Sequence, residues 1–73
     1  MTTAEFELIV RQQQGMVYSI AYNFFHNVAV AEEVAQDVFV QLYEKRHAVK
    51  SDAHAVAWLR RAATHRCLPR FHT

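Results

Sequence analysis

The last third of the sequence carries a tryptophan among cationic side chains. Trp58, Arg61 and His65 are spaced i, i+3, i+7, so in a helix they share one face. A flat ring on which bases can stack, beside cations that attract phosphates, is the chemistry that binds single-stranded nucleic acid. The alternative is that Trp58 folds onto the other helices as part of the core. The spacing therefore predicts either a nucleic-acid surface or a core contact at Trp58.

A second candidate surface lies on the segment 29–44, which has an apolar stripe and an acidic opposite face. At about 100° per residue, Glu33, Gln36 and Asp37 fall outside the stripe. Val40 and Tyr43 interrupt this polar face and give the acidic patch an apolar centre, as expected for a surface that docks a partner. The alternative is a solvated helix face with two exposed apolar residues. The stripe itself comprises Val28, Ala31, Val34, Ala35, Val38, Phe39 and Leu42.

Metal binding and catalysis are both poorly supported by the residue pattern. His65, Cys67 and His72 lie close together, but their spacing matches no familiar zinc-ligand pattern. The sequence has no glycine-rich phosphate loop, nucleophile elbow or paired-carboxylate arrangement, and Cys67 is expected to be a small buried residue. We therefore expect no metal, no cofactor and no enzymatic turnover.

The composition is typical of one small all-α domain. The 73 residues include one glycine, one proline and one cysteine, and helix-forming residues are well represented. A single cysteine forms no internal disulfide, and there is neither an apolar run of about 18 residues nor a leader sequence, so we expect a cytoplasmic protein. A core of this size rarely supplies more than about 3–5 kcal/mol. Support from a partner, or a homo-oligomer, is therefore expected.

The pattern predicts a three-helix bundle with helices at about 3–26, 28–46 and 52–67. Thr2 and Glu5 have the spacing of a capping box at the first helix. His26 and Asn27 form a short turn, which makes the first two helices antiparallel, and Ser51 or Asp52 caps the third.

Two residues interrupt the helical pattern. Gly15 lies near the middle of the first helix, so this segment is either one helix with a weak point or two helices with a bend. Pro69 is expected to end the third helix and to leave residues 70–73 frayed. The inner face of that helix comprises Val56, Leu59, Ala63 and Cys67.

The charges are distributed unevenly along the chain, although the net charge is only +1. Residues 1–44 hold six acids and one base, whereas residues 45–73 hold seven bases and one acid. A chain divided in this way can present an acidic surface to one partner and a basic surface to a polyanion.

Three parts of the sequence form a recognisable series: Phe6 with Tyr18 and Ala21, then the segment AEEVAQDVFVQLYE with Glu33, Gln36, Asp37 and Phe39, then the segment AWLRRAATHRCL. Its most specific parts are an acid-x-x-Gln-acid-x-Phe pattern and an Ala-Trp-Leu start of the third helix. In this order and spacing, the residues resemble conserved region 2 of bacterial sigma-70-type transcription initiation factors, specifically the extracytoplasmic-function group. The resemblance covers nearly the whole chain.

The resemblance implies two binding surfaces. The second helix would dock on the clamp coiled coil of the beta-prime subunit of core RNA polymerase, through Glu33, Gln36, Asp37, Val40 and Tyr43. The third helix and the loop before it would capture the non-template strand of the promoter −10 element, with a flipped base held at residues 46–51. The DNA-binding residues would be Arg46, Lys50, Trp58, Arg61 and His65. An anti-sigma factor is a further possible partner.

The third helix departs from the family pattern at three positions. His65 stands where the family usually has asparagine, Pro69 where it commonly has aspartate, and His72 where an arginine is expected. These departures affect the DNA-facing half more than the polymerase-facing half. The alternative function is a helical interaction module that binds polymerase, an anti-sigma regulator or itself without touching DNA. The chain also stops before any linker or second helix-turn-helix domain, as expected of either an excised region 2 or a degenerate relative.

Overall fold

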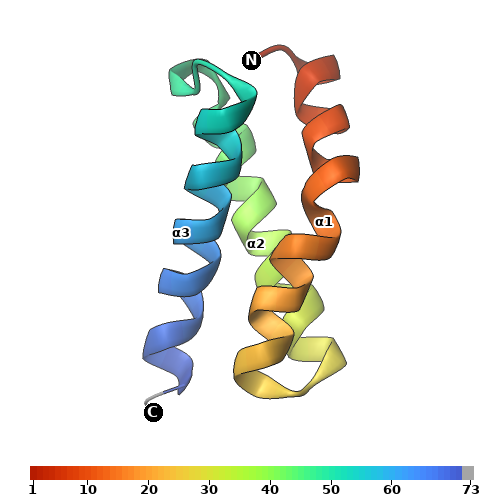
Figure 1. Cartoon of the computed structure of the whole chain (residues 1–73), viewed down its shortest axis with the longest axis vertical. Helices are drawn as coiled ribbons and strands as arrows, with labels where there is room; N and C mark the ends of the chain where they lie inside the picture. The colour runs from red at the N-terminus through yellow and green to blue at the C-terminus, as the bar shows by residue number, and fades with distance from the viewer. Residues whose placement is uncertain (72–73) are drawn as a thin grey trace.

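Three helices joined by short connections make up the fold in a computed structural model, which describes residues 1–71 and the side chains of residues 1–69. The helices are α1 (Thr3–Phe25), α2 (Val28–Glu44) and α3 (Asp52–Phe71), and the 3-10 turn η1 (Arg46–Ala48) precedes α3. Figure 1 shows α2 running antiparallel to α1, with α3 returning alongside both and the start of α1 and the end of α3 at opposite ends of the bundle. The bundle measures 35 Å along its longest axis. The predicted all-α three-helix bundle is confirmed.

Local hydrogen bonds begin each helix where the sequence predicts. At α1 the capping box is present, because the Thr2 N–H donates to Glu5 Oε1 at 2.8 Å and the Glu5 N–H donates to Thr2 Oγ1 at 3.1 Å. The bond from the Thr2 backbone lowers the pKa of Glu5, so its stabilising effect is present above the ordinary pKa and is lost as the pH falls through the lowered one. At α3 the cap is Ser51, whose Oγ accepts from the His54 N–H at 3.1 Å.

The turn between α1 and α2 reverses the chain within two residues. His26 has a left-handed backbone with φ of 50°, and its N–H donates to the Tyr22 carbonyl at 2.7 Å. Asn27 then caps α2, because its Oδ1 accepts from the Val30 N–H at 3.0 Å. This αL ending satisfies a carbonyl at the end of α1, and the short connection makes the two helices antiparallel, as predicted.

One of the two interruptions in the sequence does not break its helix. The α1 helix passes through Gly15 without a second segment, and a Cβ built at Gly15 would meet nothing within 4 Å. Of the two alternatives, the single helix is therefore the one observed.

The second interruption, Pro69, lies inside α3, which continues to Phe71. The prediction that the helix ends before Pro69 was wrong. Proline has a helical φ, and it removes one N–H near the end of the helix, where few helical bonds follow it. The predicted fraying of residues 70–73 concerns in part residues 72–73, which lie outside the described residues.

The α2 helix ends at Glu44, two residues before the predicted position 46. The Lys45 N–H donates to the carbonyls of both Gln41 and Leu42 at 3.1 Å, and the Ala48 N–H donates to the Lys45 carbonyl at 2.9 Å. These shared and shortened bonds tighten the last turn into the 3-10 turn η1. Residues 46–48 form this turn, and Ala48 lies in the stretch between the predicted helices, which was expected to be loop.

The core is a single cluster to which all three helices contribute. Most of the predicted α2 stripe is buried, but Val28 is 54% exposed because it begins α2 at one end of the bundle. On α3 the inner face is shifted slightly, since Ala55 is buried and Val56 only partly so. The buried residues are Ile9, Val17, Ala21, Ala31, Val34, Val38, Phe39, Leu42, Val49, Ala55, Leu59, Ala63 and Cys67. Among the described helices, none combines the length and apolarity needed to cross a membrane.

Candidate nucleic-acid and protein interfaces

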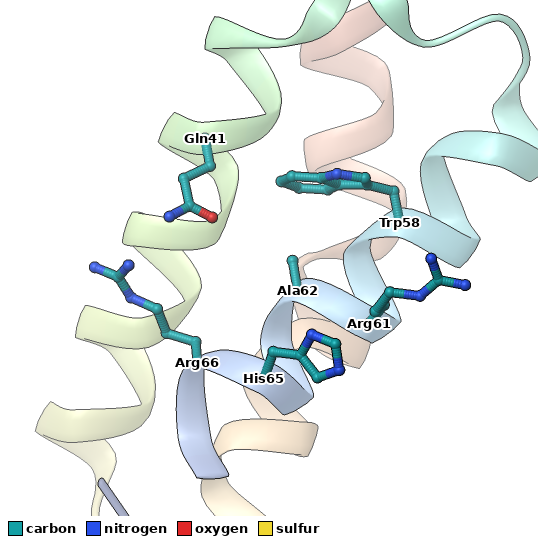
Figure 2. A pocket seen from close by; sticks show the side chains of 6 residues that line it. All are labelled: Gln41, Trp58, Arg61, Ala62, His65 and Arg66. Carbon is teal, nitrogen blue, oxygen red and sulfur yellow. The ribbon is translucent and has the colours of Figure 1, made fainter. Parts of the chain in front are cut away.

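A groove between α2 and α3 contains the tryptophan singled out in the sequence. We call it the α2–α3 groove, and its cavity volume is about 350 Å³. Figure 2 shows the side chain of Trp58 reaching from α3 toward Gln41 of α2. The residues that line the groove are Gln41, Trp58, Arg61, Ala62, His65 and Arg66.

Trp58 combines the two environments that the sequence left open. Its side chain is half-buried and packs against the core cluster, yet it also lines the α2–α3 groove. Packing restricts the ring, so little conformational entropy remains to be lost when a ligand stacks on it. The result is an aromatic surface that is held in place and still accessible.

Basic side chains line the same groove as this ring. Arg61 and His65 are exposed and line the same groove as Trp58, as their spacing suggests. In Figure 2 the side chain of Arg61 points away from α2, the ring of His65 lies in front of α3, and Arg66 extends toward α2. The groove is therefore lined by an indole ring, an imidazole and two arginine side chains, which is a suitable set for bases and phosphates.

Arg66 is a groove residue that the sequence analysis missed. Its Nη2 donates to Asp37 Oδ2 at 2.9 Å, and the two side chains are 40% and 37% exposed respectively. The sequence indicates the position of Arg66, because Trp58, Ala62 and Arg66 follow an i, i+4, i+8 pattern on one helix face. The partner of Arg66 was not predictable from local spacing, since Asp37 had been assigned to the protein-docking patch.

Arg46 and Lys50 lie apart from the α2–α3 groove, at the end of the bundle where η1 leads into α3. The Arg46 guanidinium lies 3.9 Å from the centre of the Tyr43 ring, and its Nη1 donates to the Tyr43 carbonyl at 2.7 Å. The Arg46 carbonyl accepts from the Met1 amino group at 3.1 Å. Lys50 is exposed, and its N–H donates to His54 Nδ1 at 3.3 Å. The structure thus divides the five predicted DNA-binding residues into two groups.

A second groove lies on the other side of α2, against α1. We call it the α1–α2 groove; its volume is about 390 Å³ and nearly all its lining side chains are apolar. Val40 is 54% and Tyr43 40% exposed, so both predicted apolar residues are accessible to a partner. The sequence analysis missed the contribution of α1, where the Phe6 ring meets the Tyr43 ring edge-on at 5.2 Å. The lining residues are Phe6, Val10, Gln36, Phe39, Val40 and Tyr43.

The five predicted docking residues are spread across the outer face of α2. Gln36, Val40 and Tyr43 line the α1–α2 groove. Glu33 lines a hollow on the α3 side together with His65, Arg66 and Pro69, and Asp37 is bonded to Arg66. The acidic and apolar parts of the patch therefore occupy opposite edges of one helix. The prediction of an acidic patch with an apolar centre was wrong, because Val40 and Tyr43 line the groove with α1 while Glu33 and Asp37 lie beside α3.

The histidine and cysteine group near the end of the chain does not converge. Cys67 is buried in the core, whereas His65 is exposed, and His72 lies outside the described residues. Within the described part of the chain there is no group of three or more side chains suited to hold a metal ion.

A helical bundle with an apolar groove at one edge of a helix, and a tryptophan among cations at the other, fits a domain that joins a protein partner to nucleic acid. Residues 9–72 match sigma-70 region 2, and the chain belongs to this family. The resemblance to sigma-70 region 2 inferred from the sequence is thereby confirmed. Comparisons with curated proteins and with solved structures gave no significant match. Sigma region 2 binds core RNA polymerase and promoter DNA and takes part in promoter melting, which is the general function of this domain.

Proposed function

We propose that the chain is region 2 of an extracytoplasmic-function sigma factor, acting in the bacterial cytoplasm. The outer face of α2 docks on the clamp coiled coil of the beta-prime subunit. The α3 helix, with the connection before it, holds the non-template strand of the promoter −10 element. No bond is made or broken in this process, so the proposal requires neither a cofactor nor enzymatic turnover.

The docking half of the proposal is supported by the two edges of α2. The α1–α2 groove presents Val40 and Tyr43 to a partner, and a few residues in well-packed central pockets carry most of the binding energy of an interface. The carboxylates of Glu33 and Asp37 lie on the same helix and favour a cationic partner, which steers association and fixes register. The apolar edge and the acidic edge of α2 therefore suit a partner that carries both apolar and basic residues.

The DNA half rests on one observation above all: Trp58 is held by the core and still lines a groove flanked by cations. Promoter opening requires that unstacked bases are held more favourably than in the duplex. Stacking on an aromatic ring supplies about 1–3 kcal/mol per base, and the cations add a salt-dependent affinity for phosphates. Arg46 and Lys50 lie apart from the groove and add positive charge at the connection proposed to hold a flipped base.

The test of the DNA half is binding of a fluorescent single-stranded −10-like oligonucleotide, followed by anisotropy over a series of salt concentrations. Trp58→Ala is expected to weaken binding at least fivefold, corresponding to the loss of about 1 kcal/mol or more of stacking. Arg61→Ala is expected to lower the dependence of log K on log salt by about 0.7, the value for one phosphate contact in a single strand. The matched control is Arg60→Ala, since Arg60 is the adjacent exposed arginine and does not line the groove.

The same experiment separates the proposal from the alternative of a protein-only interaction module. Binding that is absent even at low salt, or that Trp58→Ala leaves unchanged, would favour that module. Equal effects of Arg60→Ala and Arg61→Ala would show that attraction to DNA is diffuse and does not depend on the groove.

A further inference from the structure

We propose that Arg66 is a DNA-binding residue of the α2–α3 groove and that Asp37 restrains it until a protein partner occupies Asp37. This inference rests on the proposed function. It adds a residue to the DNA-binding set, and it connects the two surfaces of the domain through one ion pair.

Arg66 lies where its side chain can bind DNA. It lines the groove with Trp58, and its side chain extends toward α2. The contact that holds it there is the 2.9 Å bond to Asp37. A carboxylate and a phosphate oxygen compete for the same guanidinium donors, because both are anionic acceptors of charge-assisted hydrogen bonds. While Asp37 holds Arg66, one cation of the groove is neutralised and a negative charge stands beside the path of the DNA.

The exposure of the pair makes this restraint reversible. Both side chains are more than one-third exposed, and ion pairs in such positions are weak because solvent and salt screen them. A buried pair would hold Arg66 permanently. The exposed Arg66–Asp37 pair can be broken in two ways. A phosphate can compete for Arg66, or a basic group can compete for Asp37.

The position of Asp37 on α2 lets binding of a protein partner release Arg66. Asp37 belongs to the proposed polymerase-docking set, so a basic group of the partner that pairs with it would release Arg66. Binding of the partner and binding of DNA then favour each other, and this coupling is reciprocal because it is a difference in free energy between sites. A domain of this kind binds DNA more tightly when docked than when alone.

Asp37→Asn tests the restraint, because it removes the charge and keeps the shape. In the anisotropy assay we expect this variant to bind the oligonucleotide about two- to fivefold more tightly, the range set by an exposed ion pair. The matched control is Glu44→Gln, which removes one charge from the same helix without touching Arg66. Glu44→Gln is expected to raise the DNA affinity by a smaller factor, and that factor measures the general relief of repulsion between the domain and DNA. Circular dichroism checks that every variant is folded.

An Arg66→Ala background isolates the pair. In that background Asp37→Asn is expected to raise the DNA affinity no more than Glu44→Gln does, because the coupling between two residues disappears once either is removed. Glu33 lines a hollow with Arg66 and could take over the restraint, so Asp37→Asn is also measured together with Glu33→Gln. Adding a beta-prime clamp peptide is expected to raise the DNA affinity of the wild type more than that of Asp37→Asn.

Two outcomes would overturn the inference. The first is that Asp37→Asn, with or without Glu33→Gln, raises the affinity for the oligonucleotide no more than Glu44→Gln does. The second is that Asp37→Asn still raises the affinity more than Glu44→Gln in the Arg66→Ala background. Either result would leave the proposed function standing so long as the wild type binds the oligonucleotide through Trp58, so the two failures are distinguishable.

Discussion

Two valines on α2 are equally exposed and differ only in their surroundings. Val28 and Val40 each have a relative exposure of 54%. Val40 lines the α1–α2 groove beside Tyr43, whereas Val28 begins the helix and does not line that groove. Exposure alone therefore does not mark a docking residue, and the neighbouring apolar side chains are what make Val40 a candidate.

This pair of residues gives a matched test of docking. Val40→Arg is expected to weaken binding to a beta-prime clamp coiled-coil peptide by at least about tenfold, because central apolar contacts carry much of the energy of an interface. Val28→Arg places the same side chain at an equally exposed position and is expected to have no effect. Titration calorimetry with the peptide measures both. Equal affinities for the two variants would exclude the α1–α2 groove as the docking site.

At the scale of helices, α2 is the element on which both surfaces depend. One edge of α2 contributes Gln36, Val40 and Tyr43 to the α1–α2 groove, and the other contributes Asp37 and Gln41 to contacts with α3. The four-residue step between Asp37 and Gln41 keeps the second pair on one face. A single amphipathic helix can thus join a protein-binding surface to a nucleic-acid surface.

The α1 helix contains a weak point that makes no packing contact. A Cβ at Gly15 would meet no other atom within 4 Å, so Gly15→Ala is expected to stabilise the domain by about 0.5–1 kcal/mol, through higher helix propensity and lower entropy of the unfolded chain. Urea unfolding followed by circular dichroism measures this. A loss of stability would show that α1 needs to bend at Gly15, contrary to the single helix described here.

The domain as a whole depends on a thin core of small and medium side chains. Leu59 is fully buried between the helices, and truncating a buried leucine to alanine costs about 2–5 kcal/mol. A single core in a chain of this length supplies about 3–5 kcal/mol. The two quantities are of the same size, so one substitution is expected to remove most of the stability.

Leu59→Ala is accordingly expected to unfold most of the isolated domain at 25 °C, with loss of its helical circular dichroism signal. Leu68→Ala is the control, because Leu68 lies on the same helix and is 36% exposed. Addition of a partner that binds only the folded state is expected to restore part of the signal. A Leu59→Ala domain that melts like the wild type would show that the core is not the main source of stability.

The sequence by itself determined the features that depend on neighbouring residues. Three helices, the capping box at Thr2 and Glu5, the cap at Asn27 and the shared face of Trp58, Arg61 and His65 all follow from spacing within a few residues. Hydrogen bonds and helix faces of this kind are short-range, so they can be recognised without knowing how the helices pack. The ends of α2 and α3 were exceptions, because the last turn of α2 tightens into a 3-10 turn and a proline near a helix terminus disturbs few bonds.

Only the tertiary structure decided which distant residues meet. Asp37 and Arg66 are 29 positions apart, and Phe6 reaches Tyr43 only because α1 packs beside α2. Likewise the stacking of Arg46 on Tyr43 separates this arginine from the α2–α3 groove. Such contacts depend on the rotation of each helix about its own axis, which is fixed by the fit of side chains across the whole core and not by any local pattern.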